Sequence, residues 1–234
     1  MKRSHLALAI IVLVLIIDQA LKFWIKTSMF YGEEIDVIGD WFKLNFVENE
    51  GMAFGMTFGG KTGKVLLTIF RIVAVGFIGF FLYRLISKKS SRGLIASMAL
   101  ILAGALGNII DSVFYGLLFS DSSWHLKNVA EFLPDEGGYG ALLHGKVVDM
   151  FYFPLFSGTW PNWIPMVGGD EFLFFRPVFN IADAAITVGV IIILVFQKRF
   201  FGETGKEEEP EVQVSEQAVS NEEPFSPPGK SDQY

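Results

Sequence analysis

The sequence of 234 residues contains no cysteine, which excludes disulfide bonds, a cysteine nucleophile and metal sites built on thiolates. Its three histidines, His5, His125 and His144, lack the spacing of a metal site. Neither the Gly-x-Ser-x-Gly turn of serine hydrolases nor a glycine-rich phosphate loop is present. We therefore predict no metal and no cofactor, and carboxylates remain as the credible catalytic groups.

The chain also lacks a basic excess, since its formal net charge is −6. From residue 203 onward nine acidic residues stand against two lysines, a net charge of −7, which leaves +1 for residues 1–202. Without a basic stripe, nucleic-acid binding has no electrostatic basis. The Glu, Pro, Ser and Gln content of residues 202–234 predicts an acidic, disordered tail.

Long apolar runs, in contrast, are abundant, and the mean hydropathy is +0.42. A bilayer core requires about 20 mostly apolar residues per helix. Four segments fit this length: Leu6–Ile25, Val65–Ile86, Leu94–Phe119 and Val178–Phe196. No small-residue cleavage site follows the first segment, so we interpret it as a retained span rather than a secretory signal. The predicted fold is an all-α membrane protein with four transmembrane helices.

Lysine and arginine near the ends of the spans predict the orientation. One side of the membrane holds a dense basic set, made of Lys2, Arg3, Arg84, Lys88, Lys89, Arg92, Lys198 and Arg199. Both termini are therefore predicted to be cytoplasmic, with residues 27–64 and 120–177 outside. Loose alternation of apolar and polar residues over 35–58 predicts a small sheet on the outer surface, and residues 120–177, rich in aromatics, Gly and Pro, predict an interfacial cap. Residues 1–201 thus form one membrane domain.

Each predicted span carries at least one ionisable residue in its outer half. At 1.5 Å per residue, Asp18, Arg71, Asp111 and Asp183 lie roughly 8 to 12 Å from the outer ends of their spans. Lys22, Asn108 and Asn180 fall in the same layer. Charged residues inside a membrane are costly and normally mark a functional site that faces the bundle interior or a wet cavity. The layer therefore predicts a site.

Several of these residues also have a structural interpretation. Asp18 and Lys22 are four residues apart on one helix face, so they can neutralise each other as a structural pair. Arg71 is assigned a supporting role, because it can pair with any nearby carboxylate. Asn108 and Asp111 share a face, and helix packing does not require them. The segment from Asn49 to Gly55, considered alone, favours an ordinary turn.

Asp149 and Asp183 differ in their predicted environments. Both lie at the outer face beside apolar residues, which raise the pKa of a carboxyl group by desolvation. Asp183 also lies in the first turn of the last span, where a helix N-terminus favours the anion. Two carboxylates with differently biased pKa values can share a proton and act as acid and base.

Taken in order, these motifs resemble those of the prolipoprotein signal peptidases (signal peptidase II), aspartic proteases of the bacterial cytoplasmic membrane. The resemblance covers roughly residues 6–197. The matching motifs are Asp18-x3-Lys22, Asn49-x-Gly51-x-Ala53-Phe54, Gly104-x2-Gly107-Asn108-x2-Asp111, Val147-Val148-Asp149 and Phe179-Asn180-x-Ala182-Asp183.

The resemblance implies cleavage of a diacylglyceryl-modified prolipoprotein just before its lipidated cysteine, at the outer face of the membrane. Asp149 and Asp183 match the catalytic dyad, which activates a water molecule. The residues that match supporting or substrate-binding positions are Asn49, Gly51, Asn108, Asp111 and Asn180, and Asp18 and Lys22 match the structural polar pair. Membrane lipids are implied partners, and globomycin-type cyclic peptides are implied inhibitors.

The chain departs from the family pattern in three respects. Ser112 stands where the family usually has Arg after the third-span Asp, and Arg71 is a candidate to supply the missing charge. Asp111 and Asp149 are farther apart than is typical. The insertion Ser120–Leu143 is expected to extend the outer cap and to affect substrate access.

Two other functions fit a polar layer in a membrane protein. A transporter requires polar residues that lead to both sides, often with inverted repeats, but the inner halves of these spans are almost wholly apolar and no repeat is visible. A non-catalytic lipid-binding scaffold would tolerate loss of Asp149 or Asp183, and both are present. The protease is therefore the favoured prediction.

Overall fold

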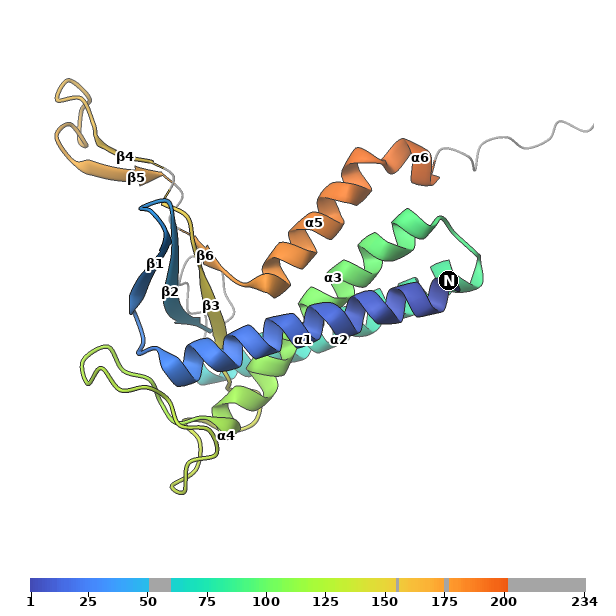
Figure 1. Ribbon diagram of the computed structural model, residues 1–234, viewed down its shortest axis with the longest axis horizontal. Helices are drawn as coiled ribbons and strands as arrows, with labels where there is room; N and C mark the ends of the chain where they lie inside the picture. Colours follow the sequence, from blue (N-terminus) through green and yellow to red (C-terminus); the bar gives the residue numbers. More distant parts are fainter. Residues whose placement is uncertain (51–59, 155, 175–176, 202–234) are drawn as a thin grey trace, which may run out of the picture.

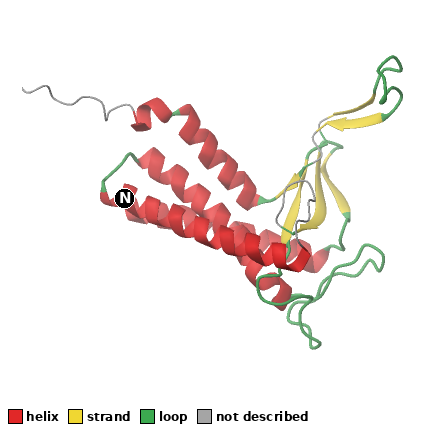
Figure 2. Ribbon diagram, turned by 180° about the vertical axis from the view of Figure 1, so that it is seen from behind, coloured by secondary structure: helices red, strands yellow, loops and turns green. Residues whose placement is uncertain are grey.

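The structure is a computed structural model that describes residues 1–50, 60–154, 156–174 and 177–201. Gly51 and the predicted acidic tail, residues 202–234, lie outside the described residues. Helices occupy one end of the molecule and strands the other (Figure 2).

Among the described residues, three helices are long and apolar enough to cross a membrane: α1 (Arg3–Ser28), α2 (Gly60–Ser87) and α3 (Arg92–Ile110), which the short helix α4 (Gly116–Leu118) extends. α3 packs against α1, α2 and α5 (Ile181–Val195), so it is the central helix of the bundle (Figure 1). Large apolar side chains point outward, as expected for a lipid-facing surface, and Phe77 on α2 is 70% exposed.

The last predicted span is shorter in the structure than in the sequence analysis. α5 is apolar but has 15 residues, and the short helix α6 (Gln197–Phe201) follows it. Val178 and Phe179, predicted to begin the span, form strand β6 instead. The four-span topology with both termini in the cytoplasm stays a prediction.

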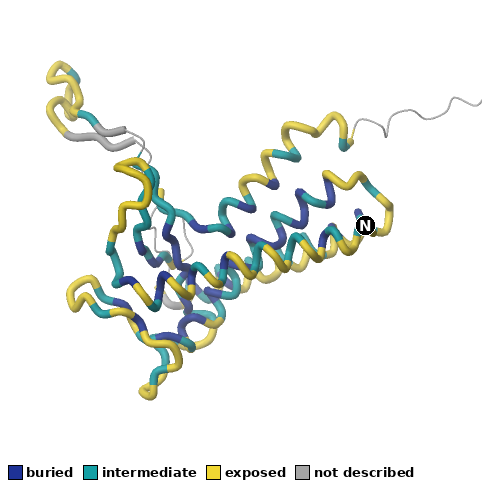
Figure 3. Tube along the Cα trace, in the orientation of Figure 1, coloured by how far each residue is buried: buried dark blue, intermediate teal, exposed yellow. Residues whose placement is uncertain are grey.

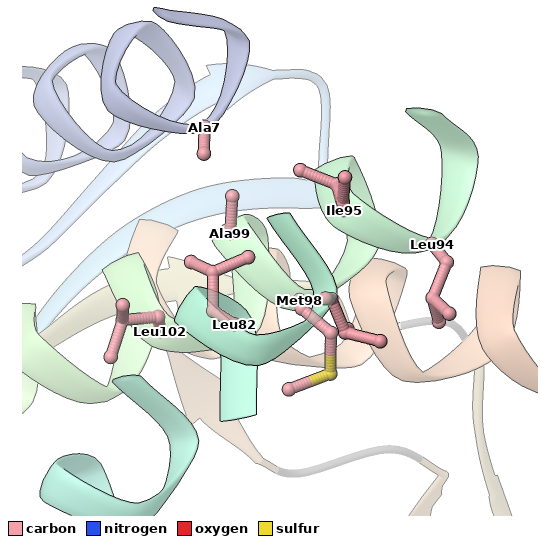
Figure 4. Packing of buried hydrophobic residues seen from close by; sticks show 8 residues of the cluster. Ala7, Leu82, Leu94, Ile95, Met98, Ala99 and Leu102 are labelled. Carbon is pink, nitrogen blue, oxygen red and sulfur yellow. The ribbon is translucent and has the colours of Figure 1, made fainter. Parts of the chain in front are cut away.

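The inner half of the bundle is held by close packing of apolar side chains. Ala7 of α1, Leu82 of α2 and Ile95 and Ala99 of α3 belong to one buried cluster (Figure 4). Since none of these side chains carries a polar atom, this cluster offers no site for acid–base chemistry.

Glycine allows α3 and α5 to approach each other closely in the outer half. A Cβ atom on Gly104 would lie 2.1 Å from the carbonyl oxygen of Ala182, and one on Gly107 would lie 2.6 Å from a carboxylate oxygen of Asp18. Small residues at helix interfaces permit such contacts in membrane proteins. Gly104 and Gly107 are therefore packing residues, and the close approach brings the polar side chains of α1, α3 and α5 within hydrogen-bonding reach.

An antiparallel sheet covers one end of the helix bundle, the end predicted to face outward (Figure 1). Its strands are β1 (Glu34–Ile38), β2 (Phe42–Asn49), β3 (Val147–Tyr152) and β6 (Val178–Phe179), in the order β1-β2-β3-β6. The predicted surface sheet is thus present, and two strands from the second outer segment complete it. A second pair, β4 (Phe156–Thr159) and β5 (Glu171–Phe174), projects from this sheet as a hairpin.

The outer end of the third span is not the regular helix that the sequence predicted. A π-helical turn, Asp111–Tyr115, separates α3 from α4. The loop before β3 fastens to this turn, since the backbone N–H of Gly145 donates to the carbonyl oxygen of Ser112 (2.9 Å) and that of Leu143 to Val113 (3.1 Å). π-Helical turns are frequent at functional sites. The buried residues gather where this turn, the helices and the sheet meet (Figure 3).

Candidate active site

Asp149 enters the site from strand β3. The strand pairs with β2 so that Asp149 lies opposite Val47. Val47 precedes Asn49 by two residues on β2. The Asn49 side chain donates a hydrogen bond to one carboxylate oxygen of Asp149, and Nδ2 of Asn180 donates to the other at 2.6 Å. Asp149 is 3% exposed, and each of its carboxylate oxygens accepts a hydrogen bond from an amide group.

Asp183 enters from the first turn of α5, where it takes part in a capping box. The backbone N–H of Asp183 donates to Oδ1 of Asn180 (2.9 Å), and the backbone N–H of Asn180 donates to Oδ2 of Asp183 (3.3 Å). Reciprocal capping fixes the first turn of a helix. Oδ1 of Asp183 accepts a further hydrogen bond from Nδ2 of Asn108 (2.8 Å).

Asn180 therefore joins the two predicted dyad residues. Its Oδ1 binds the backbone of Asp183 while its Nδ2 binds the carboxylate of Asp149, and it is fully buried. Nδ2 also lies 3.2 Å from the carbonyl oxygen of Val148, one residue before Asp149 on β3. One side chain thus couples the start of α5 to the strand that carries the other carboxylate.

Burial raises the pKa of Asp149 to about 8, and the charge of Asp183 contributes in the same direction. The hydrogen bonds from Asn49 and Asn180 oppose this shift because they favour the anion. The raised pKa favours the protonated form of Asp149 near neutral pH. The predicted difference between the environments of the two carboxylates stays a prediction.

The predicted pair Asp18–Lys22 is part of a larger buried cluster. Nζ of Lys22 lies 3.0 Å from the carboxylate of Asp18, 2.7 Å from that of Asp111 and 2.9 Å from Oδ1 of Asn108. Asp18 in turn accepts the backbone N–H of Ala182 at 2.9 Å and so caps the start of α5. A pair that looked self-contained on one helix in fact connects α1, α3 and α5.

Sequence reasoning missed Gln19, which lies beside this cluster. Its Nε2 donates to Asp111 (2.9 Å), to Asp18 (3.1 Å) and to the carbonyl oxygen of Gly107 (3.3 Å), and its Oε1 accepts from the Tyr115 hydroxyl. As an uncharged residue it gave no signal in a search for ionisable groups. Its position next to Asp18 was the only available indication.

Arg71 reaches the site from α2. Its guanidinium interacts electrostatically with both Asp183 and Asp149, so it is a cation that faces the pair. The predicted supporting residues Asn49, Arg71, Asn108, Asp111 and Asn180 thus surround the two aspartates or the adjoining cluster, while Gly51 lies outside the described residues. Ser112 does not replace an arginine charge, because it is buried and its Oγ donates to the carbonyl oxygen of Asn108 (2.9 Å).

A second ionic cluster, in which Lys26 and Glu48 are buried, lies nearer the sheet and was not predicted. Lys26, one helical turn beyond Lys22, pairs with Glu48 of β2, and Glu48 also lies 3.3 Å from Nζ of Lys146. Lys146 lies 3.4 Å from Asp121 of the insertion. Since Glu48 precedes Asn49, this cluster ties the cap and the insertion to the strand that supports Asp149.

Comparison with known proteins decides the family. The model of the signal peptidase II family matches residues 10–199. The chain belongs to this family. A lipoprotein signal peptidase of Porphyromonas gingivalis is 48% identical over 192 residues, which cover 82% of each chain. One of Amoebophilus asiaticus is 40% identical over 189 residues, which cover 80% of this chain and 75% of the relative.

The fold agrees with the family assignment. A solved structure of a bacterial membrane enzyme, determined by the in meso method, superposes with a TM-score of 0.52 at 26% sequence identity. The match covers 86% of this chain and 93% of the solved chain. As a member of the signal peptidase II family the chain is an aspartic endopeptidase of a bacterial membrane. The acidic tail lies beyond the matched residues.

Proposed function

We propose that this endopeptidase removes the signal peptide from diacylglyceryl-modified prolipoproteins by cleaving just before the lipidated cysteine. The names of the relatives support the substrate class. The observation that carries the mechanism is that Asp149 and Asp183, from different elements, bind the same buried asparagine, Asn180. The helix α5 and the strand β3 therefore present two carboxylates to one point.

The reaction needs one ionised and one protonated carboxyl group. Asp183, at a helix N-terminus and hydrogen-bonded to Asn108, is the ionised base that takes a proton from water. The hydroxide attacks the scissile carbonyl carbon, and Asp149 donates its proton toward the developing oxyanion. The proton on Asp183 then passes to the leaving amine as the C–N bond breaks, and Asp149 takes back a proton from a hydroxyl group of the collapsing tetrahedral intermediate, which restores the dyad. Arg71 stabilises the negative charge of the pair.

The proposed setting is the outer face of the bacterial cytoplasmic membrane, with four helices crossing it and both termini inside. The basic residues gathered at the far ends of the helices support this orientation. The apolar outer surface of α2, including the exposed Phe70 and Phe77, supports contact of the substrate's acyl chains with lipid beside the site. Globomycin-type cyclic peptides are proposed to occupy the same site.

The assay uses the purified protein in detergent with two precursors that differ only in the diacylglyceryl group. We expect cleavage of the lipidated precursor, with the modified cysteine as the new amino terminus in mass spectrometry, and none of the unmodified one. Equal cleavage of both precursors, or a new terminus elsewhere, would contradict the proposed specificity.

The rate should decline on the alkaline side as Asp149 loses its proton. Its pKa is raised to about 8, so above that pH both carboxylates are ionised and no acid faces the oxyanion. We expect kcat/KM for the lipidated precursor to fall through about pH 8, while tryptophan fluorescence shows that the protein stays folded. A rate that does not change on the alkaline side would be incompatible with Asp149 as the acid.

A further inference from the structure

The orientation of the partly buried Asn108 amide, next to the dyad, is set by a lysine. Oδ1 of Asn108 faces Nζ of Lys22 at 2.9 Å, and Nδ2 of Asn108 faces Oδ1 of Asp183 at 2.8 Å. An ammonium group can only donate hydrogen bonds. The oxygen of Asn108 must therefore point to Lys22, which leaves its NH2 group for Asp183.

The amide of Asn180 is oriented in the same way, with its N–H groups toward the dyad. Its Nδ2 lies 3.1 Å from Oδ1 of Asn108 and 2.6 Å from the carboxylate of Asp149, while its Oδ1 accepts the backbone N–H of Asp183. Oδ1 of Asn108 thus accepts from both Lys22 and Asn180. Starting at Lys22, both amides in this network present N–H to a carboxylate of the dyad.

We propose that Lys22 is a positioning residue, whose ammonium group orients the Asn108 amide so that Asp183 stays the ionised member of the dyad. The inference rests on the proposed function of the dyad and deepens it. The described hydrogen bonds and ion pairs of Lys22 include neither aspartate of the dyad. Its charge lowers the pKa of Asp149 through space, while its link to Asp183 runs through Asn108. This role differs from mutual neutralisation with Asp18.

The contacts of Lys22 support a role beyond neutralisation. A lysine has three N–H donors, and its three partners are Asp18 at 3.0 Å, Asp111 at 2.7 Å and Asn108 at 2.9 Å. The third contact, with a neutral amide, adds nothing to charge balance. The Lys22 side chain is fully buried, so water cannot take the place of this donor.

Without Lys22, Oδ1 of Asn108 keeps, among its described contacts, the 3.1 Å one from Nδ2 of Asn180, a group already bound more closely to Asp149 at 2.6 Å. The Asn108 amide can then turn over and present its oxygen to Asp183. Two acceptors cannot face each other at 2.8 Å unless one carries a proton, so the dyad's proton would move toward Asp183. Among the residues that the structure describes, the groups that face Asp183 are Arg71 from α2, Asp149 from β3, Asn108 from α3 and Asn180 at the start of α5. Of these, Asn108 is the one whose donor pattern changes when Lys22 is lost.

The test removes the lysine without changing the net charge of its cluster. The variant combines Lys22→Met with Asp111→Asn, which removes one positive and one negative charge. The control combines Lys26→Met with Glu48→Gln, the buried pair one turn farther out on α1, which contacts neither Asn108 nor Asp183 in any described interaction. Both variants are assayed with the lipidated precursor over the full pH range.

We expect the Lys22 variant to lose about 10- to 100-fold in kcat, the value of a charge-assisted hydrogen bond. The acidic side of its pH–rate profile should also move to higher pH, because Asp183 has lost its donor. KM should change little. The Lys26 control should keep the wild-type profile, even where its stability is lower.

Infrared titration of the protonated carboxyl band, without substrate, follows the proton of the dyad directly in both variants. A wild-type pH profile and carboxyl titration in the Lys22 variant would overturn the inference and leave the proposed function intact. If the wild type does not cleave, the proposed function fails, and the infrared titration alone then decides for or against the role of Lys22. Should the double variant not fold, the Lys22→Met variant alone replaces it, with the same results counting for and against the inference.

Discussion

Asparagine in place of Asp183 is expected to abolish cleavage of the lipidated precursor while the protein stays folded in detergent. The substitution keeps the shape of the side chain, and the amide oxygen that it introduces can still accept the backbone N–H of Asn180 in the capping box. It removes the base, which contributes about 100- to 10,000-fold to a hydrolytic rate. We expect the same for Asp149→Asn, because that variant has no acidic proton to donate.

The matched control is Asp170→Asn, which makes the same change at an exposed aspartate on the projecting hairpin. It should cleave at the wild-type rate. The measurements are single-turnover cleavage and the midpoint of thermal unfolding. If either dyad variant kept a rate close to that of the wild type, that carboxylate could not be the catalytic group. Unfolding of both variants would instead assign the two residues to the stability of the fold.

The polar layer could be predicted because it stands out in an apolar background. Asp18, Asn108, Asp111 and Asp183 are rare polar residues in long hydrophobic runs, so helical geometry alone placed them at one depth. In the structure they belong to one continuous network. Local spacing sufficed here because each residue lies on or at the end of a helix whose apolar length predicts its position across the bilayer.

The cluster of Lys26, Glu48 and Lys146 could not be predicted in this way. Lys26 lies at the outer end of its helix, where lysine is ordinarily an interfacial residue, and Glu48 lies on an alternating strand. Their pairing depends on how β2 crosses the end of α1, which no local pattern encodes. Contacts between residues distant in sequence are set by tertiary packing.

The start of the last helix was also predicted wrongly, again because tertiary packing decides it. Val178 and Phe179 are as compatible with a membrane helix as with a strand. They become β6 because Phe179 pairs with Phe151 of β3, which lies two residues after Asp149. The pairing ends the strand before Asn180 and lets Asn180 serve as the N-cap of α5. The shortened helix is thus what brings Asp183 to the end of a sheet.

A substitution series at Asn180 separates its two roles, because different atoms carry them. Oδ1 caps α5, and Nδ2 bridges to Asp149. Asn180→Ser retains a good N-cap but lacks the bridging N–H. Asn180→Asp also retains a cap, but it replaces the Nδ2 group that donates to Asp149 with a carboxylate oxygen. Unfolding midpoints and cleavage rates measured on the same preparations distinguish capping from bridging.

We expect Asn180→Ser to change stability by less than about 1 kcal/mol. Its cleavage rate should fall about 10- to 100-fold, since the lost bond is a charge-assisted one worth about 1.5–3 kcal/mol. Asn180→Asp should be slower still, because a third carboxylate at this point repels both members of the dyad and draws the shared proton to itself. Asn180→Ala, which loses both roles, should be less stable than either. If Asn180→Ser cleaved at the wild-type rate, the bridge from α5 to Asp149 would have no part in catalysis, and the capping box alone would account for the asparagine.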